Sequence, residues 1–127
     1  MTPRAILDGA SSLLSEPPAS MRRCWPRGCA CLTRMALEEG LRGYWAQVAP
    51  SLADRPMRHQ LLTLPRYAGN EAAALARPAW HGLSRAMHHH CYELAPTAAE
   101  LRGWHQDVER VLRLLEDKTA ASPTPHG

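Results

Sequence analysis

The sequence predicts an all-α fold, a bundle of four to five helices that are mostly antiparallel. The 127 residues include 20 Ala and 17 Leu but only three Val, one Ile and no Phe. This composition favours helices, because strands are enriched in β-branched and aromatic residues. Apolar residues recur at helical spacing, and prolines separate the segments by short links, which favours antiparallel neighbours. A chain of this length is expected to form one domain.

We divide the chain into an N-terminal helix with a Pro-rich linker (residues 1–20), a bundle core (21–117) and a disordered tail (118–127). The first helix is expected over residues 4–15, with one apolar side, and Pro17 and Pro18 end it. A longer helix is expected over 26–48. It carries two apolar stripes, which is typical of a central helix: Cys29, Leu32, Met35, Ala36 and Gly43, and Leu37, Leu41, Tyr44 and Val48.

Glycines and prolines set further expectations for the middle of the chain. Gly40 and Gly43 are expected to let a neighbouring backbone approach the long helix closely. A short helix should cover 57–64 and end at Pro65 and Gly69. Asn70 is expected to be the N-cap of the next helix, which should reach residue 90 or 92. Pro78 is expected to kink or restart this helix.

The last helix has the clearest signals. Thr97 and Glu100 have the spacing of a capping box, in which each side chain satisfies a free backbone N–H. The residues that follow form an apolar face opposite a charged one, and the apolar members are Ala98, Leu101, Trp104, His105, Val108, Leu112 and Leu115. This pattern predicts an amphipathic helix that faces the core.

Charge and hydropathy exclude some classes of protein. The net charge is +3, and Lys118 is the only Lys among 15 basic residues. The arginines recur from Arg4 to Arg113 without the clustering that indicates a nucleic-acid surface. No uncharged apolar run approaches the roughly 18 residues of a spanning helix, and Asp8 interrupts the start of the chain, which predicts no signal peptide. We therefore expect a cytoplasmic protein with reduced cysteines and no membrane partner.

The most unusual segment covers residues 85–93 and contains three consecutive histidines, His88, His89 and His90. Helical spacing places His90 on the apolar face and His89 between the faces. The opposite face holds Arg77, His81, Arg85, His88 and Tyr92. The alternative roles are a buried, hydrogen-bonded imidazole for His90 and a solvated face for His81 and His88.

The spacing Arg85-x4-His90, late in the penultimate long helix, resembles the Arg-x4-6-His signature of HEPN domains. The resemblance implies a compact helical bundle, and in many members a metal-independent ribonuclease of toxin–antitoxin, phage-defence or RNA-processing systems. It implies that Arg85 stabilises the phosphate and that His90 is the general acid or base, with no cofactor. The partners it implies are RNA, an antitoxin or other protein, and a second copy of the chain, since the cleft often lies between two subunits.

Helix geometry leaves alternatives for the partner of Arg85. In an unbroken helix Arg85 and His90 point about 140° apart, so a shared cleft requires unwinding near His88 or a second subunit. His89 is a rival, because it lies at i+4 from Arg85. Glu39 could hydrogen-bond Arg85 or His90 across the bundle. In the competing interpretation, Glu38 and Glu39 pair instead with Arg34 or Arg42 on their own helix.

Two other functions remain open from the sequence. One is a catalytically inactive interaction module that binds a partner protein or a nucleotide through the face with Arg77, His81, Arg85, His88 and Tyr92. The other is a zinc-binding regulator that uses Cys24, Cys29 and Cys31 together with Cys91 or a histidine. The spacing fits zinc poorly, because there is no second cysteine pair and Cys29 and Cys31 point about 200° apart on a helix.

Overall fold

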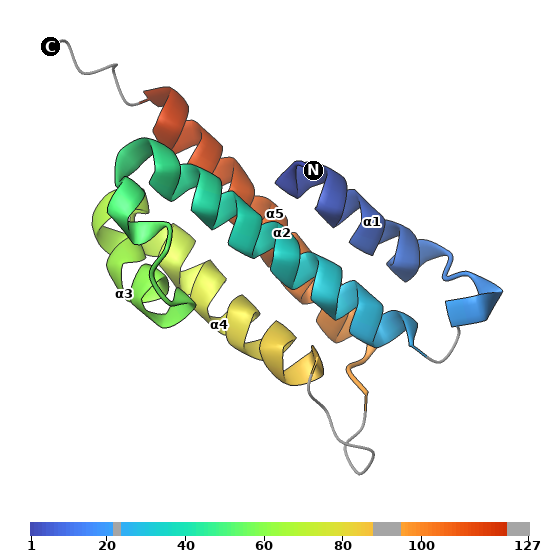
Figure 1. The fold of residues 1–127 in the computed structure, drawn as a ribbon. Coiled ribbons are helices and arrows are strands. Elements are labelled where there is room, and N and C mark those ends of the chain that lie inside the picture. Colours follow the sequence, from blue (N-terminus) through green and yellow to red (C-terminus); the bar gives the residue numbers. More distant parts are fainter. Residues whose placement is uncertain (22–23, 88–94, 122–127) are drawn as a thin grey trace, which may run out of the picture.

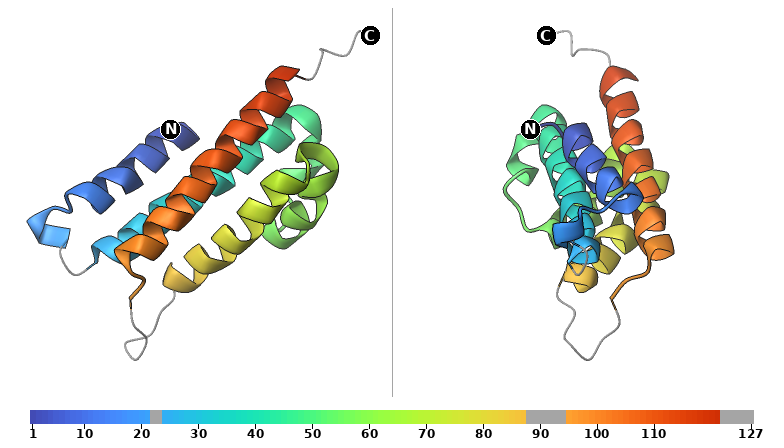
Figure 2. Two further views of the ribbon diagram at one scale, coloured as in Figure 1. Left: turned by 180° about the vertical axis from the view of Figure 1, so that it is seen from behind. Right: turned by 90° about the vertical axis from the view of Figure 1, so that its right-hand side faces the viewer.

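The computed structural model describes residues 1–21, 24–87 and 95–121, and these form five α-helices, two short 3-10 turns and no strand. The helices are α1 (Pro3–Ser15), α2 (Trp25–Val48), α3 (Met57–Ala68), α4 (Asn70–Met87) and α5 (Ala98–Ala121), and the turns cover Ala19–Met21 and Pro50–Leu52. Figures 1 and 2 show the expected all-α bundle, in which α1 and α4 run antiparallel to α2 and α5. None of the helices in the described residues is long and apolar enough to cross a membrane.

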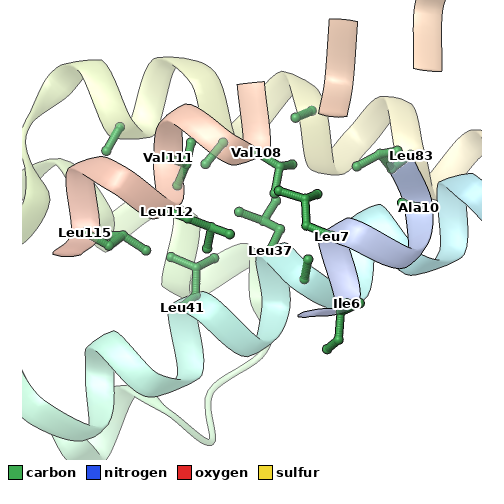
Figure 3. Close-up of a cluster of buried hydrophobic side chains, with 14 of the residues drawn as sticks. Ile6, Leu7, Ala10, Leu37, Leu41, Leu83, Val108, Val111, Leu112 and Leu115 are labelled. Atoms are coloured by element: carbon green, nitrogen blue, oxygen red, sulfur yellow. The ribbon is translucent and has the colours of Figure 1, made fainter. Parts of the chain in front are cut away.

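The long helix α2 is central, as its two apolar stripes predict, because it packs against α1, α4 and α5. Its core residues lie among leucines and valines of α5 and aliphatic residues of α1, and Figure 3 shows this cluster. Two details of the stripes differ from expectation. Met35 is 44% exposed, whereas Thr33 is fully buried. Burial of Thr33 is possible because its hydroxyl donates to the Cys29 carbonyl at 2.8 Å.

Polar contacts fix the ends and neighbours of several helices. The capping box of α5 is confirmed, since the Thr97 N–H donates to Glu100 Oε1 at 3.0 Å and the Glu100 N–H donates to Thr97 Oγ1 at 3.1 Å. His105 of α5 contacts the Leu7 carbonyl of α1 through Nε2 at 3.1 Å. These contacts hold α1 and the start of α5 in place.

Several helix limits differ from those expected. Helix α3 passes through Pro65 and ends before Gly69, whose φ of 94° stops the helix. Burial of Leu64 and Ala68 keeps that last turn helical despite the proline. Asn70 is the first residue of α4, and α4 continues across Pro78 without a restart. Helix α5 runs to Ala121, into the tail expected to be disordered, and residues 122–127 lie outside the described part.

Gly40 and Gly43 of α2 do not receive a neighbouring backbone. A Cβ added at Gly40 would collide with the Leu112 side chain of α5, whereas one at Gly43 would meet nothing within 4 Å. The expectation that a backbone approaches is therefore wrong at both glycines, although at Gly40 a side chain of α5 occupies the space that the missing Cβ leaves. At Gly43 it is wrong, because α1 begins at Pro3 and does not extend over this turn.

Candidate functional site

Helix α4 exposes the row predicted for it. Arg77, His81 and Arg85 are all exposed, and they recur every four residues, which corresponds to a rise of about 6 Å per step. The opposite face is buried and is composed mainly of small residues, among them Ala72, Ala76, Ala79 and Gly82. His88, His89, His90 and Tyr92 lie outside the described residues, so the remainder of the predicted site is not placed.

Arg34 of α2 holds the last turns of α4. Its Nη1 lies 3.4 Å from Ser84 Oγ and 3.6 Å from Met87 Sδ, while its Nε donates to Glu38 at 3.1 Å. The guanidinium also lies 5.4 Å from the centroid of the Trp80 ring, within range of a cation–π interaction. Arg34 thus contacts residues on both sides of Arg85, and it fixes the end of α4 against the central helix.

Ion pairs divide the arginines into two groups. Arg4, Arg34, Arg42, Arg110 and Arg113 each form an ion pair with a glutamate. The described part of the chain gives no ion pair to Arg55, Arg58, Arg66, Arg77, Arg85 and Arg102. All of these except Arg102 lie on α3, on α4 or just before α3. The hairpin of α3 and α4 therefore carries cationic side chains that pair with no carboxylate of the described residues.

The sequence also explains this imbalance. Glu71 is the only acidic residue from Met57 to Met87, and its carboxylate lies 3.4 Å from Arg110 of α5. Arg58 and Arg66 were not singled out from the sequence, because the arginines recur along the whole chain. The scarcity of acidic residues between 57 and 87 is the signal that distinguishes this segment.

A shallow hollow adjoins the row on α4. It has a volume of about 360 Å³ and lies where the end of α3 meets the first half of α4. Its lining residues are Pro65, Asn70, Ala73, Ala74, Arg77 and Pro78. Arg77 thus lies at a concave part of the hairpin, next to the turn that carries Arg66.

Glu39 is not a partner of Arg85 in the structure. Its carboxylate accepts a hydrogen bond from Arg42 Nη1 at 2.8 Å, and its side chain is 37% exposed. Glu38 pairs with Arg34 at i−4. The competing interpretation of these two carboxylates is therefore correct, although Glu39 pairs at i+3 rather than i+4. Partial exposure and a near arginine remove the need for a partner across the bundle.

The cysteines of α2 are separated by the helix. Cys29 is fully buried, and its thiol lies 3.6 Å from the Ala10 carbonyl of α1. Burial raises the pKa of this thiol, which opposes formation of a thiolate ligand. Cys24 is exposed, Cys31 is half-buried, and Cys91 lies outside the described residues. Within the described ranges, no three His, Cys, Asp or Glu side chains are grouped so as to hold a metal ion.

The candidate site thus consists of an exposed cationic row on α4, whose last turns Arg34 contacts, and α3 carries further exposed arginines without an ion pair in the described residues. Its chemistry is recognition of anions, since arginine binds phosphate through two parallel hydrogen bonds. Comparison of the chain with protein-family models, with curated proteins and with solved structures gives no match.

Proposed function

We propose that this chain is an RNA-directed domain of HEPN type that cleaves RNA without a metal ion. Arg85 would bind the phosphate at the cleaved bond, and His90 would transfer the proton as general acid or base. The observation that carries the proposal is the exposed row of Arg77, His81 and Arg85, which has no ion pair among the described residues. An arginine without a carboxylate neighbour has its N–H donors available for a phosphate, and no nearby negative charge offsets its own.

The charge of the hairpin supports an anionic polymer as the partner. Arg58 and Arg66 on α3 are two further exposed arginines without an ion pair among the described residues, and Glu71, the single acidic residue from Met57 to Met87, is already paired. A chain of phosphates would gain from several such contacts at once, whereas a small anion would use one. RNA is favoured over DNA by the resemblance to HEPN domains, in which the 2′-hydroxyl of RNA attacks the phosphate.

The test is incubation of the purified chain with labelled RNA in the presence and absence of EDTA. We expect cleavage that survives EDTA and is lost in Arg85→Ala and in His90→Ala. Arg102→Ala is the matched control, because Arg102 is also exposed and without an ion pair in the described part, but lies on α5. Cleavage that persists in Arg85→Ala, or that EDTA abolishes, contradicts the proposal.

A second candidate is a catalytically inactive interaction module that uses the same face of α4. It is favoured by the pairing of Glu39 with Arg42, because Glu39 belongs to the predicted catalytic set and is engaged on its own helix. The module would bind a partner protein or a nucleotide through Arg77, His81 and Arg85. RNA or nucleotide binding that depends on Arg85, with no cleavage by the folded protein, would favour this candidate over the ribonuclease.

A further inference from the structure

A groove lies at the end of the bundle opposite Arg85, where α1 does not cover the space between α2 and α5. Helix α1 has 13 residues, whereas α2 and α5 have 24 each. Because α1 begins near Gly40, it leaves the C-terminal halves of α2 and α5 uncovered on its side of the bundle, while α3 and α4 pack on their other side (Figure 1). The groove has a volume of about 510 Å³ and is bounded by the first residues of α1 and by the C-terminal halves of α2 and α5.

The walls of the groove are largely apolar. Leu112 and Leu115 of α5 contribute from one side, and Leu112 packs directly on Gly40 of α2. Tyr44 of α2 also lines the groove and is only 5% exposed. The described part of the chain offers its hydroxyl no hydrogen-bond partner. The hydroxyl is not among the buried polar groups without a partner in the described residues, so water reaches it, and in the groove the acceptor of a ligand can replace that water.

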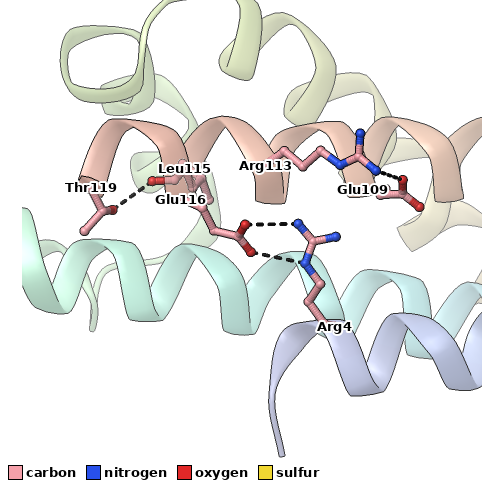
Figure 4. A network of polar contacts seen from close by, with 6 residues as sticks. All are labelled: Arg4, Glu109, Arg113, Leu115, Glu116 and Thr119. Atoms are coloured by element: carbon pink, nitrogen blue, oxygen red, sulfur yellow. Dashed lines mark hydrogen bonds and ion pairs between the residues drawn. The ribbon is translucent and has the colours of Figure 1, made fainter. Parts of the chain in front are cut away.

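The rim carries charges that cancel. Arg4 donates to both carboxylate oxygens of Glu116, from Nε at 3.2 Å and from Nη2 at 3.1 Å, as Figure 4 shows. Thr119 donates its hydroxyl to the Leu115 carbonyl at 2.8 Å, so it is already bonded. Because Arg4 and Glu116 neutralise each other, the rim offers no net charge that would attract a charged ligand. Tyr44 stays protonated near neutral pH, since burial raises its pKa, and it is therefore a donor.

We propose that this groove binds an uncharged, mainly apolar small molecule whose hydrogen-bond acceptor takes the Tyr44 hydroxyl. Its volume lies within the range of roughly 300–1,000 Å³ that small-molecule sites occupy. Mainly apolar walls with a few polar groups are also typical of such sites, because the walls supply affinity and the polar groups fix orientation. The site is independent of the row on α4.

The test uses two probes of nearly equal shape, acetophenone, which has a carbonyl acceptor, and ethylbenzene, which has none. Each is titrated into the isotopically labelled full chain, with amide NMR shifts as the readout. We expect both to shift residues around Gly40 and Leu112, and acetophenone to bind about fivefold more tightly, as one hydrogen bond provides. In Tyr44→Phe the two affinities should become equal.

Two pairs of variants control for unfolding and for nonspecific binding. Ala120→Phe places a ring at a residue that lines the groove and should abolish binding of both probes, whereas Ala46→Phe, at an exposed position of α2 outside the groove, should not. Gly40→Ala should push Leu112 into the groove and weaken binding, whereas Gly43→Ala adds a methyl group where nothing lies within 4 Å. Absence of saturable shifts at the groove, or an unchanged affinity ratio in Tyr44→Phe, would overturn the proposal.

Discussion

Trp104 of α5 lies directly against the backbone of Gly82 in α4. A Cβ built on Gly82 would be 2.5 Å from two carbons of the indole ring and 2.8 Å from its nitrogen. A side chain at this position would displace the ring, so the glycine sets how closely α4 and α5 approach. The contact lies five residues before the end of α4, and it positions the same helix that carries the cationic row.

Gly82→Ala should therefore destabilise the protein although alanine is the better helix former. We expect a loss of about 1–3 kcal/mol in the free energy of unfolding, because the indole ring and the helix backbone must move apart. Gly43→Ala is the matched control within another helix, and the open space there predicts a gain of up to about 1 kcal/mol. Denaturant unfolding measures both, and a stabilising Gly82→Ala would contradict the contact.

Gln60 is a buried polar residue that joins α3 to α2 and to the loop between them. Its Oε1 accepts from Trp45 Nε1 at 3.1 Å, and its Nε2 donates to the Arg55 carbonyl at 2.7 Å. Gln60→Met should cost about 1–3 kcal/mol, because Trp45 then keeps a buried N–H without a partner. Adding Trp45→Phe should cost less than the two single changes together, and strict additivity in denaturant unfolding would exclude the coupling.

Thr97 contributes to stability through the capping box of α5. Thr97→Ala removes the acceptor of the Glu100 N–H, and we expect a loss of about 1 kcal/mol in the free energy of unfolding. Thr63→Ala is the control, because the Thr63 hydroxyl donates only to the His59 carbonyl within α3. Equal effects of the two changes would show that the cap does not add stability.

Asp107 of α5 opposes folding at neutral pH. Burial raises the pKa of its carboxyl, so the folded state disfavours the charged form relative to the unfolded state. The cost is full above the folded pKa and disappears below the unfolded pKa of about 3.9. Asp107→Asn should therefore stabilise the protein at pH 7 and lose this advantage as the pH falls through the raised folded pKa toward about 4. A gain that stays constant with pH in thermal unfolding would contradict this origin.

The fold was predictable where a local signal and the apolar pattern agree. Thr97, Glu100 and the apolar face that follows them define α5, and the bundle of antiparallel helices follows from similar patterns. The apolar pattern does not predict that Met35 is exposed and Thr33 is buried, because burial at these positions depends on where α1 lies against α2. The helix end expected at Pro65 was wrong for a comparable reason. Burial of Leu64 and Ala68 in the core keeps α3 helical for another turn despite the proline.

The candidate site was predictable only in part. The exposed row on α4 follows from helical spacing alone, and Arg77, His81 and Arg85 occupy it as expected. The importance of Arg58 and Arg66 depends on which arginines find a carboxylate, and pairs such as Arg4–Glu116 and Arg110–Glu71 join residues far apart in the chain. Such pairs form only after the helices pack, so spacing along the sequence cannot reveal them.

The salt dependence of RNA binding tests the central claim most directly, that the unpaired arginines of α4 bind the phosphates. Anisotropy of a labelled single-stranded RNA gives the affinity at several salt concentrations for the wild type and for Arg77→Ala, Arg85→Ala and Arg102→Ala. We predict that the first two variants weaken binding and each lower the slope of log K against log salt by about 0.7, the value for one phosphate contact. Arg102→Ala should leave the slope unchanged. Equal slopes for all four proteins, or a loss in Arg102→Ala alone, would contradict the claim.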